Sequence, residues 1–219
     1  MFSSILHISR ILLLGFVLLH SDTCFGRDCS TSDIQFVVRS INATNSIKAD
    51  FVEHISNSIS KGYITWLRPA SIKMEYHSPK KILLLSQDAN VMLHYDFELK
   101  EASYVPIRNT ALLKIIGNNI VNLQKQLHVK RCDIDGDITS LWMSGIIMGK
   151  EVEDYENTEI KVEFQNIVEN TVLSIRRIIV YRFGKIHSLL TLSNAKLNHG
   201  VNKSDFHFKD PTFYGANDE

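Results

Sequence analysis

The sequence predicts a mainly β protein in which an antiparallel sheet folds into a sandwich or barrel and the helices are short. Apolar and polar residues alternate with a period of two in several segments, as expected for strands with one face toward a core. Turn signals separate these segments at intervals of about 8–12 residues. No long helical pattern lies between them, which disfavours a parallel sheet.

The N-terminal residues 1–26 are predicted to be a signal peptide. Arg10 supplies the positive charge that precedes the apolar run of residues 11–19. This run is shorter than the roughly 20 apolar residues of a membrane span. The pattern therefore indicates export.

Cleavage after Gly26 places small residues, Cys24 and Gly26, at the two positions that signal peptidases favour. Residues 27–219 would then form a single exported domain. Two alternatives are an uncleaved membrane anchor and a lipid attached to Cys24.

The first element of the mature chain is expected to be a short amphipathic helix over about residues 33–43. Its apolar positions follow helical spacing, and residues 30–33 offer N-cap candidates. The period then changes to two, most clearly in residues 47–55 and 71–77. About five or six strands are expected between residues 47 and 105, and about five more between residues 127 and 208.

A second short helix is predicted over residues 109–117. Its apolar residues, among them Leu112, Leu113 and Ile116, spread around most of the circumference, which favours burial on nearly all sides. In a barrel, such a helix would cover the open mouth as a plug or lid. The alternative is an ordinary helix that packs outside the sheet.

The charge balance argues against two classes of partner. Lys and Arg together equal Asp and Glu, 24 of each. The sequence shows no basic stripe of the kind that binds nucleic acid, and the same balance argues against a strong electrostatic grip on anionic lipid.

Two cysteines, Cys29 and Cys132, remain after signal removal. In an oxidising compartment they either form a disulfide or stay as free thiols.

The motifs of common enzymes are missing from the sequence, which has no GxSxG, HExxH, P-loop or dinucleotide-binding pattern. We therefore expect no enzyme activity, no cofactor and no metal. Residues 133–137 lack the order of ligands in a calcium loop, so a hairpin turn at Asp135-Gly136 is the better interpretation. The acidic residues within 151–156 are expected to form a solvated loop.

Residues 62–79 carry a Gly, a strand with an aromatic residue, Arg68-Pro69, and a second strand that ends in an aromatic residue and a Pro. An apolar strand, a turn and an aromatic strand with Tyr-Asp follow, up to residue 99. In this order the chain resembles the LolA family of outer-membrane lipoprotein carriers. Residues 47–51 resemble the family's opening strand, and residues 205–211 resemble its Phe-x-Phe-x-x-Pro closing strand. Ala89 stands where Gly is usual, and residues 118–170 match poorly.

The resemblance implies an incomplete antiparallel β-barrel whose apolar cavity is covered by short helices. It also implies a monomeric periplasmic chaperone that needs no cofactor. Such a chaperone takes acylated lipoproteins from an inner-membrane lipoprotein-releasing ABC transporter and passes them to an outer-membrane acceptor lipoprotein. The alternatives are an outer-membrane acceptor or another acyl-chain-binding module of related fold, and, less favoured, an exported enzyme.

Arg68 matches the family position for a polar latch, since a guanidinium can hold several helix-end carbonyls at once. The lid residues are expected to be Leu112, Leu113 and Ile116. Candidates for the cavity lining come from the apolar faces of the early strands: Phe51, Trp66, Met74, Tyr76 and Leu93.

Overall fold

The computed structural model describes residues 26–88, 90–106, 129–144, 158–167 and 172–208. Within them, a 12-stranded antiparallel sheet has the order β1-β8-β9-β10-β11-β12-β2-β3-β4-β5-β6-β7. The elements are β1 (Arg27–Asp28), α1 (Thr31–Ala43), β2 (Ser46–Ile55), β3 (Ser58–Leu67), β4 (Ser71–Ser78), β5 (Ile82–Ser86), β6 (Val91–Asp96), β7 (Glu101–Pro106), β8 (Val129–Asp135), β9 (Ile138–Ser144), β10 (Thr158–Ile167), β11 (Val172–Arg182), β12 (Lys185–Leu197) and the 3-10 helix η2 (Lys203–Phe206).

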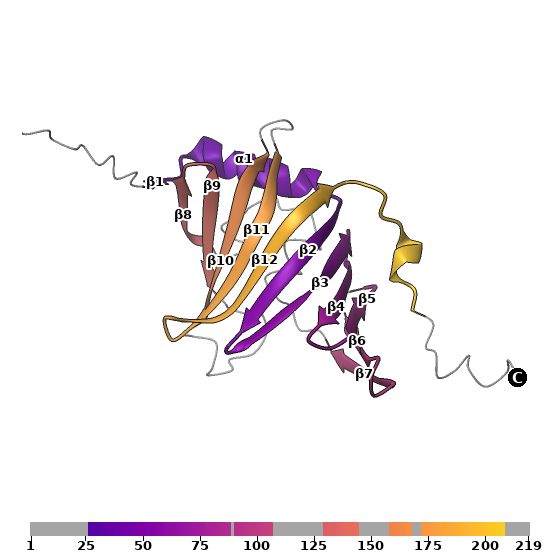
Figure 1. Ribbon diagram of the computed structural model, residues 1–219. Helices are drawn as coiled ribbons and strands as arrows, with labels where there is room; N and C mark the ends of the chain where they lie inside the picture. The colour runs from indigo at the N-terminus through magenta and orange to yellow at the C-terminus, as the bar shows by residue number, and fades with distance from the viewer. Residues whose placement is uncertain (1–25, 89, 107–128, 145–157, 168–171, 209–219) are drawn as a thin grey trace, which may run out of the picture.

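The sheet curves strongly but does not close, because its first strand, β1, and its last, β7, do not pair with each other. The last strand in sequence, β12, pairs with β2, the first long one, and so joins the two halves of the chain in the middle of the sheet. In Figure 1, α1 lies across one end of this curved sheet. These features confirm the predicted fold class, a mainly β, incomplete antiparallel barrel with few helices.

The alternation of residues in β2 shows how the sequence builds two faces. Ile47, Ala49 and Phe51 are buried, whereas Lys48 and Asp50 between them are half-exposed. Successive side chains of a strand point to opposite sides, so the buried set faces one side only. We call this side, against which α1 packs, the inner face and the other side the outer face.

Gly62 is a position where the inner face tolerates no side chain. It lies opposite Phe51 on β2 and Tyr76 on β4. A Cβ there would overlap the ring of Phe51, at 2.7 Å from its Cζ, and the backbone carbonyl of Glu75. Glycine therefore lets the Phe51 ring lie flat against β3, where it meets the ring of Tyr76 edge-on at 4.9 Å between centroids.

Helix α1 begins at Thr31, two residues earlier than the sequence pattern predicted. Ser30 is the N-cap, and it forms a capping box with Asp33, in which each side chain bonds the backbone of the other residue. Ser30 is one of the N-cap candidates predicted at residues 30–33, whereas the apolar spacing alone placed the start of the helix two residues late.

The hairpin turn predicted near Asp135-Gly136 is confirmed. Asp135 pairs with Ile138, so Gly136 and Asp137 form the two-residue turn between β8 and β9. Gly136 has φ +58°, a backbone conformation that glycine adopts without strain.

The closing strand that the family resemblance implied at residues 205–211 is not formed in the described part, residues 205–208. Lys203–Phe206 form η2, in which the Asn202 backbone N–H bonds the Asp205 carboxylate at 3.2 Å and Asp205 N–H bonds the Asn202 carbonyl at 3.0 Å. Asn198 and Gly200, both with positive φ, have already turned the chain away from β12. The Phe-x-Phe pattern is therefore used to pack aromatic rings and not to pair a strand.

Residues 1–25, which hold most of the predicted signal peptide, lie outside the described residues, as do the predicted helix 109–117 and the acidic segment 151–156. None of the helices described is long and apolar enough to cross a membrane.

Candidate functional site

A continuous apolar cluster covers the inner face from β8 to β4. It includes the side of α1 that faces the sheet, through Val37 and Ile41. Cross-strand partners carry it without a break from Cys132 on β8 to Leu141 on β9 and Val162 on β10. The buried residues of the sheet in this cluster are Ile47, Ala49, Phe51, Ile64, Trp66, Ile72, Met74, Cys132, Leu141, Met143, Val162, Phe164, Leu173, Ile175 and Leu192.

Four of the five cavity candidates share this inner face. Phe51, Trp66 and Met74 are buried in the cluster, and the half-buried Tyr76 packs against it. Pairing of β2, β3 and β4 places them together, because Gly62 lies opposite both Phe51 and Tyr76, and Ile64 lies opposite Met74. Their role in binding acyl chains stays a prediction.

Leu93 does not join them. It pairs with Leu85, which pairs with Lys73, so it lies on the outer face, whereas Met74 pairs with Leu84 on the inner face. There Leu93 belongs to a second apolar cluster, made with Leu83, Leu85, Tyr95 and Phe206. In β6 the buried Leu93 and Tyr95 face outward, where the chain after β12 covers them, and His94 and Asp96 lie on the inner face. Alternation alone could not show which of the two sides is covered.

Arg68, at the end of β3, holds the C-terminal end of α1. Its Nε donates to the carbonyl of Thr44 at 2.8 Å, and its Nη2 donates to the carbonyl of Ile41 at 2.7 Å. The last carbonyls of a helix lack partners within the helix, and a cation near them is also favoured by the helix dipole. Burial lowers the pKa of Arg68. The structure thus gives Arg68 helix-end carbonyls on α1, while its contact with residues 109–117 stays a prediction.

Asn198 supports the same helix end, and no sequence pattern indicated this role. Its Nδ2 donates to the carbonyl of Ala43 at 2.8 Å, and its Oδ1 accepts from the backbone N–H groups of Asn45 and Ser46, at 2.6 and 3.2 Å. Asn198 lies just after β12, more than 150 residues from these partners. Only the pairing of β12 with β2 brings them together.

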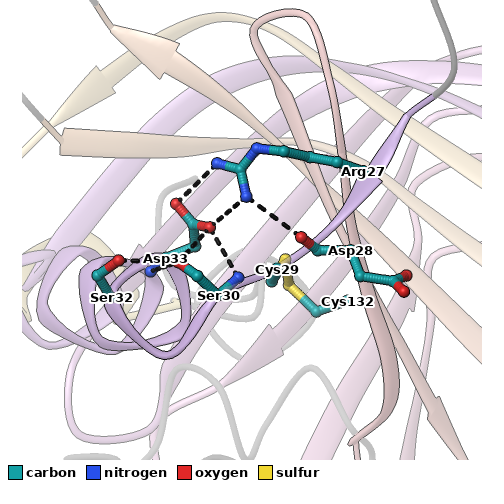
Figure 2. Close-up of polar contacts among 7 residues, drawn as sticks. All are labelled: Arg27, Asp28, Cys29, Ser30, Ser32, Asp33 and Cys132. Carbon is teal, nitrogen blue, oxygen red and sulfur yellow. Dashed lines mark hydrogen bonds and ion pairs between the residues drawn. A yellow bond between two sulfur atoms is a disulfide. The ribbon is translucent and has the colours of Figure 1, made fainter.

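The N-terminal end of α1 is held by a disulfide between Cys29 and Cys132, whose Cα atoms are 5.3 Å apart (Figure 2). The Cys29 backbone N–H also donates to the Cys132 carbonyl at 3.0 Å. Cysteine pairing, which the sequence left open, therefore ties the start of α1 to β8.

Arg27 adds an ion pair at this end. Its two terminal nitrogens reach the two carboxylate oxygens of Asp33 at 2.6 and 3.1 Å (Figure 2). The hydrogen bonds from Arg27 and Ser30 hold the pKa of Asp33 well below its usual range. Because α1 is fixed at both ends, it is a static cover over one end of the inner face.

Tyr76, Glu53 and Trp66 bring polar atoms to the inner face without dividing its apolar cluster. The hydroxyl of Tyr76 donates to Oε2 of Glu53 at 2.9 Å. Burial, the charge of Glu53 and this hydrogen bond all raise the pKa of Tyr76. The indole Nε1 of Trp66 is fully buried and finds no hydrogen-bond acceptor within the described ranges. A buried donor without an acceptor is unfavourable, so a carbonyl brought by a ligand would stabilise it.

A hollow of about 610 Å³ lies on the outer face, between β2, β3, β4 and the segment that follows β12. Its walls include Lys48, Asp50, Lys73 and Glu75. Lys48 lies 3.6 Å from Asp205, and Lys73 lies 3.0 Å from Glu75. This charged lining does not suit an acyl chain, whereas the inner face is apolar.

The same strands that build the inner face carry the sequence match. A profile of the family described as "Outer membrane lipoprotein carrier protein LolA" matches residues 42–209. The chain belongs to the LolA family. The match runs from the end of α1 to just beyond η2, so it covers Arg68 and all of β2 to β12. A comparison with curated proteins finds no significant match.

Solved structures show weaker likenesses to this LolA-family chain. A DUF1329 family protein from Desulfovibrio piger has a TM-score of 0.44 and 10% identity, over 83% of this chain and 98% of the other. A LolA superfamily protein from Nitrosomonas europaea has a TM-score of 0.40 and 10% identity, over 80% and 97%. The MucA/MucB complex of Pseudomonas aeruginosa has a TM-score of 0.40 and 6% identity, over 80% of this chain and 59% of that one. The family assignment stands on the sequence match.

Proposed function

We propose that this LolA-family protein is a periplasmic chaperone that shields the acyl chains of lipoproteins against the inner face of its open sheet. In this proposal it receives them from an inner-membrane lipoprotein-releasing ABC transporter and delivers them to an outer-membrane acceptor lipoprotein. The proposal rests on one observation above all, the unbroken apolar cluster on the inner face of an unclosed sheet. It is a carrier role and needs no catalytic group.

The energetics of acyl chains explain why such a surface needs a cover. Each CH₂ group removed from water contributes roughly 0.8 kcal/mol, so several fully buried chains would bind too tightly to be released. A cover that competes for the same surface weakens binding to a useful level. Since α1 is fixed at both ends, we assign the movable cover to the predicted helix 109–117, with Leu112, Leu113 and Ile116 as its inserting residues.

Trp66 offers a polar contact for the same ligand. Acyl chains of a lipoprotein are attached through ester and amide groups. The carbonyl oxygen of each group can accept a hydrogen bond from the buried Nε1–H of Trp66. This contact would place the start of a chain near α1 and its length along the inner face toward β9 and β10.

The test is release of lipoproteins from spheroplasts by the purified mature protein. We expect acylated lipoproteins to leave the membrane in a complex with it, while a form of the same lipoprotein made without acylation is not bound. Failure to release lipoproteins above the level seen without added protein would contradict the carrier role.

Neighbouring residues on β12 supply a matched pair of variants. Leu190 packs against the apolar cluster of the inner face, whereas Leu189 points to the outer face. Both side chains are half-buried. Leu190→Asn should lower the yield of released lipoprotein, and Leu189→Asn should not. Equal loss in both, with equal loss of thermal stability, would show a folding defect and no inner-face site.

The alternative role, an outer-membrane acceptor of related fold, predicts a different N-terminus. An acceptor would be anchored by a lipid on Cys24, whereas the carrier would begin at Arg27 after cleavage of residues 1–26. The mass of the mature protein, purified from the membrane and soluble fractions, separates the two roles.

A further inference from the structure

Two turns lie side by side at the end of the sheet away from α1, one joining β2 to β3 and the other joining β11 to β12 (Figure 1). They adjoin because β12 pairs with β2, with Ser188 opposite Ile55. The Ser56 N–H also donates to the His187 carbonyl at 3.4 Å. The two turns therefore form one surface.

This surface exposes large apolar side chains. Phe183 is 69% exposed, Ile186 59%, Ile59 52% and Ile55 42%. We call these four residues the apolar tip. Ile55 lies opposite Ser188 on the inner side, whereas Ile59 lies opposite His54 on the outer side, so the apolar tip exposes apolar side chains on both sides of this end of the sheet. Single exposed apolar residues are common, but four on two adjoining turns mark a candidate interaction site.

Phe183 is unfavourable in two respects. It has φ +50° and is followed by Gly184 at φ +72°, the pair of conformations that a two-residue hairpin turn normally fills with Asn-Gly. A bulky side chain at positive φ is strained, and its ring gains no burial here. Strain that persists without a packing benefit points to a functional contact outside the chain.

Basic residues flank the apolar tip. Arg182 and Lys185 lie directly opposite each other at the base of the Phe183 turn. Among the described residues neither makes an ion pair. Lys80 and Lys81 lie in the β4–β5 turn at the same end of the sheet. The charge of Lys80 acts on the nearby Asp96, so Arg182 and Lys185 are the cations that we assign to the apolar tip.

We propose that the apolar tip inserts into the headgroup region of an anionic lipid bilayer, with Arg182 and Lys185 against the lipid phosphates. Peripheral membrane binding combines two contributions. Apolar side chains are buried in the headgroup region of the bilayer, and nearby cations are attracted to the anionic headgroups. This goes beyond the carrier role, which requires only contacts with lipoproteins and with proteins that donate and accept them. Docking would hold the protein at a membrane surface while cargo moves.

The experiment is flotation of the mature protein with vesicles of phosphatidylethanolamine and phosphatidylglycerol, compared with vesicles of phosphatidylcholine alone. We expect the protein to float with the anionic vesicles and far less with the neutral ones. Added salt should weaken the binding without abolishing it, since salt screens the cations but leaves apolar insertion in place.

Phe183→Asn is the sharpest variant, because Asn suits the positive φ of this turn and should preserve the fold. We expect it to lower partition onto the vesicles by about tenfold or more, the loss expected for one aromatic side chain that is no longer buried. Tyr104→Asn is the matched control, because Tyr104 is equally exposed, at 69%, but lies on the edge strand β7. It should bind as the parent does.

Arg182→Gln with Lys185→Gln should lower binding to anionic vesicles and leave the weak binding to neutral ones unchanged. The proposal is overturned if the parent floats with neither kind of vesicle, or if Phe183→Asn binds as well as the parent. Release of lipoproteins from spheroplasts is measured on the same variants. If that release depends on the tip while vesicles do not bind, the tip contacts a protein and the membrane proposal is wrong.

Discussion

The guanidinium of Arg68 lies 2.7 Å from the carbonyl oxygen of Ile41, and this hydrogen bond joins the end of β3 to the last turn of α1 across 27 residues of sequence. With the bond to Thr44, it fixes the edge of the inner face where α1 ends. These bonds hold α1, and the role of Arg68 as the latch of a cover at residues 109–117 stays a prediction.

Arg68→Leu should separate loading from unloading. Hydrogen bonds from a charged donor contribute about 1.5–3 kcal/mol each. In our proposal Arg68 also bonds the cover at residues 109–117. Losing those bonds should weaken the closed, empty state more than the filled one, so lipoprotein should accumulate on the carrier and reach the acceptor less efficiently. The measurement is the fraction of bound lipoprotein before and after the acceptor is added, with thermal melting as a check on folding. If the folded variant delivers cargo as the parent does, Arg68 is not the latch.

Leu113→Asp tests the lid. In the proposed empty state, Leu113 faces the apolar inner surface, where a carboxylate would be desolvated at high cost. The variant should hold the cover open and bind an environment-sensitive apolar dye more strongly than the parent. Unchanged dye fluorescence in a folded variant would count against a lid at residues 109–117.

Removing the disulfide tests how α1 is held. Cys29 and Cys132 close a loop with a sequence separation of 103, and loss of a disulfide in a small exported domain costs about 2–5 kcal/mol. The variant Cys29→Ser with Cys132→Ala should therefore melt at a lower temperature than the parent. A reductant should lower the melting temperature of the parent only. An unchanged melting temperature in the double variant would show that the bridge does not stabilise the fold.

The phenol of Tyr76 should lose its proton at a higher pH than an exposed tyrosine does. Burial and the nearby charge of Glu53 raise the pKa of Tyr76 above the ordinary value of 10.0. Because the fold favours the neutral phenol, this part of the stability is present below pH about 10 and is lost as the pH rises further. An ultraviolet titration of the folded protein should show one phenol fewer ionising at high pH than unfolded protein does. Glu53→Gln should lower the pKa of Tyr76, and a tyrosine titration identical to the parent's would contradict the contact.

Sequence patterns predicted the strands more accurately than they predicted where the helix begins and where the last strand ends. The segments 47–55 and 71–77 became β2 and β4 almost without change, because burial of one face requires a period of two. The start of α1 was placed two residues late and the segment after β12 was expected to be a strand, because capping by Asp33 and the turns at Asn198 and Gly200 depend on polar contacts and backbone angles.

The sequence by itself determined that the chain is mainly β, that it belongs with the LolA family, and that Phe51, Trp66 and Met74 could be apolar neighbours. Those conclusions follow from the alternation of apolar and polar residues within segments and from the order of the family's motifs along the chain. Only the tertiary structure decided which side of the sheet Leu93 faces, that Arg68 and Asn198 meet the same helix end, and that Cys29 bonds Cys132. Each of these depends on which distant strands pair, and above all on the pairing of β12 with β2, because hydrogen bonds and packing act between neighbours in space.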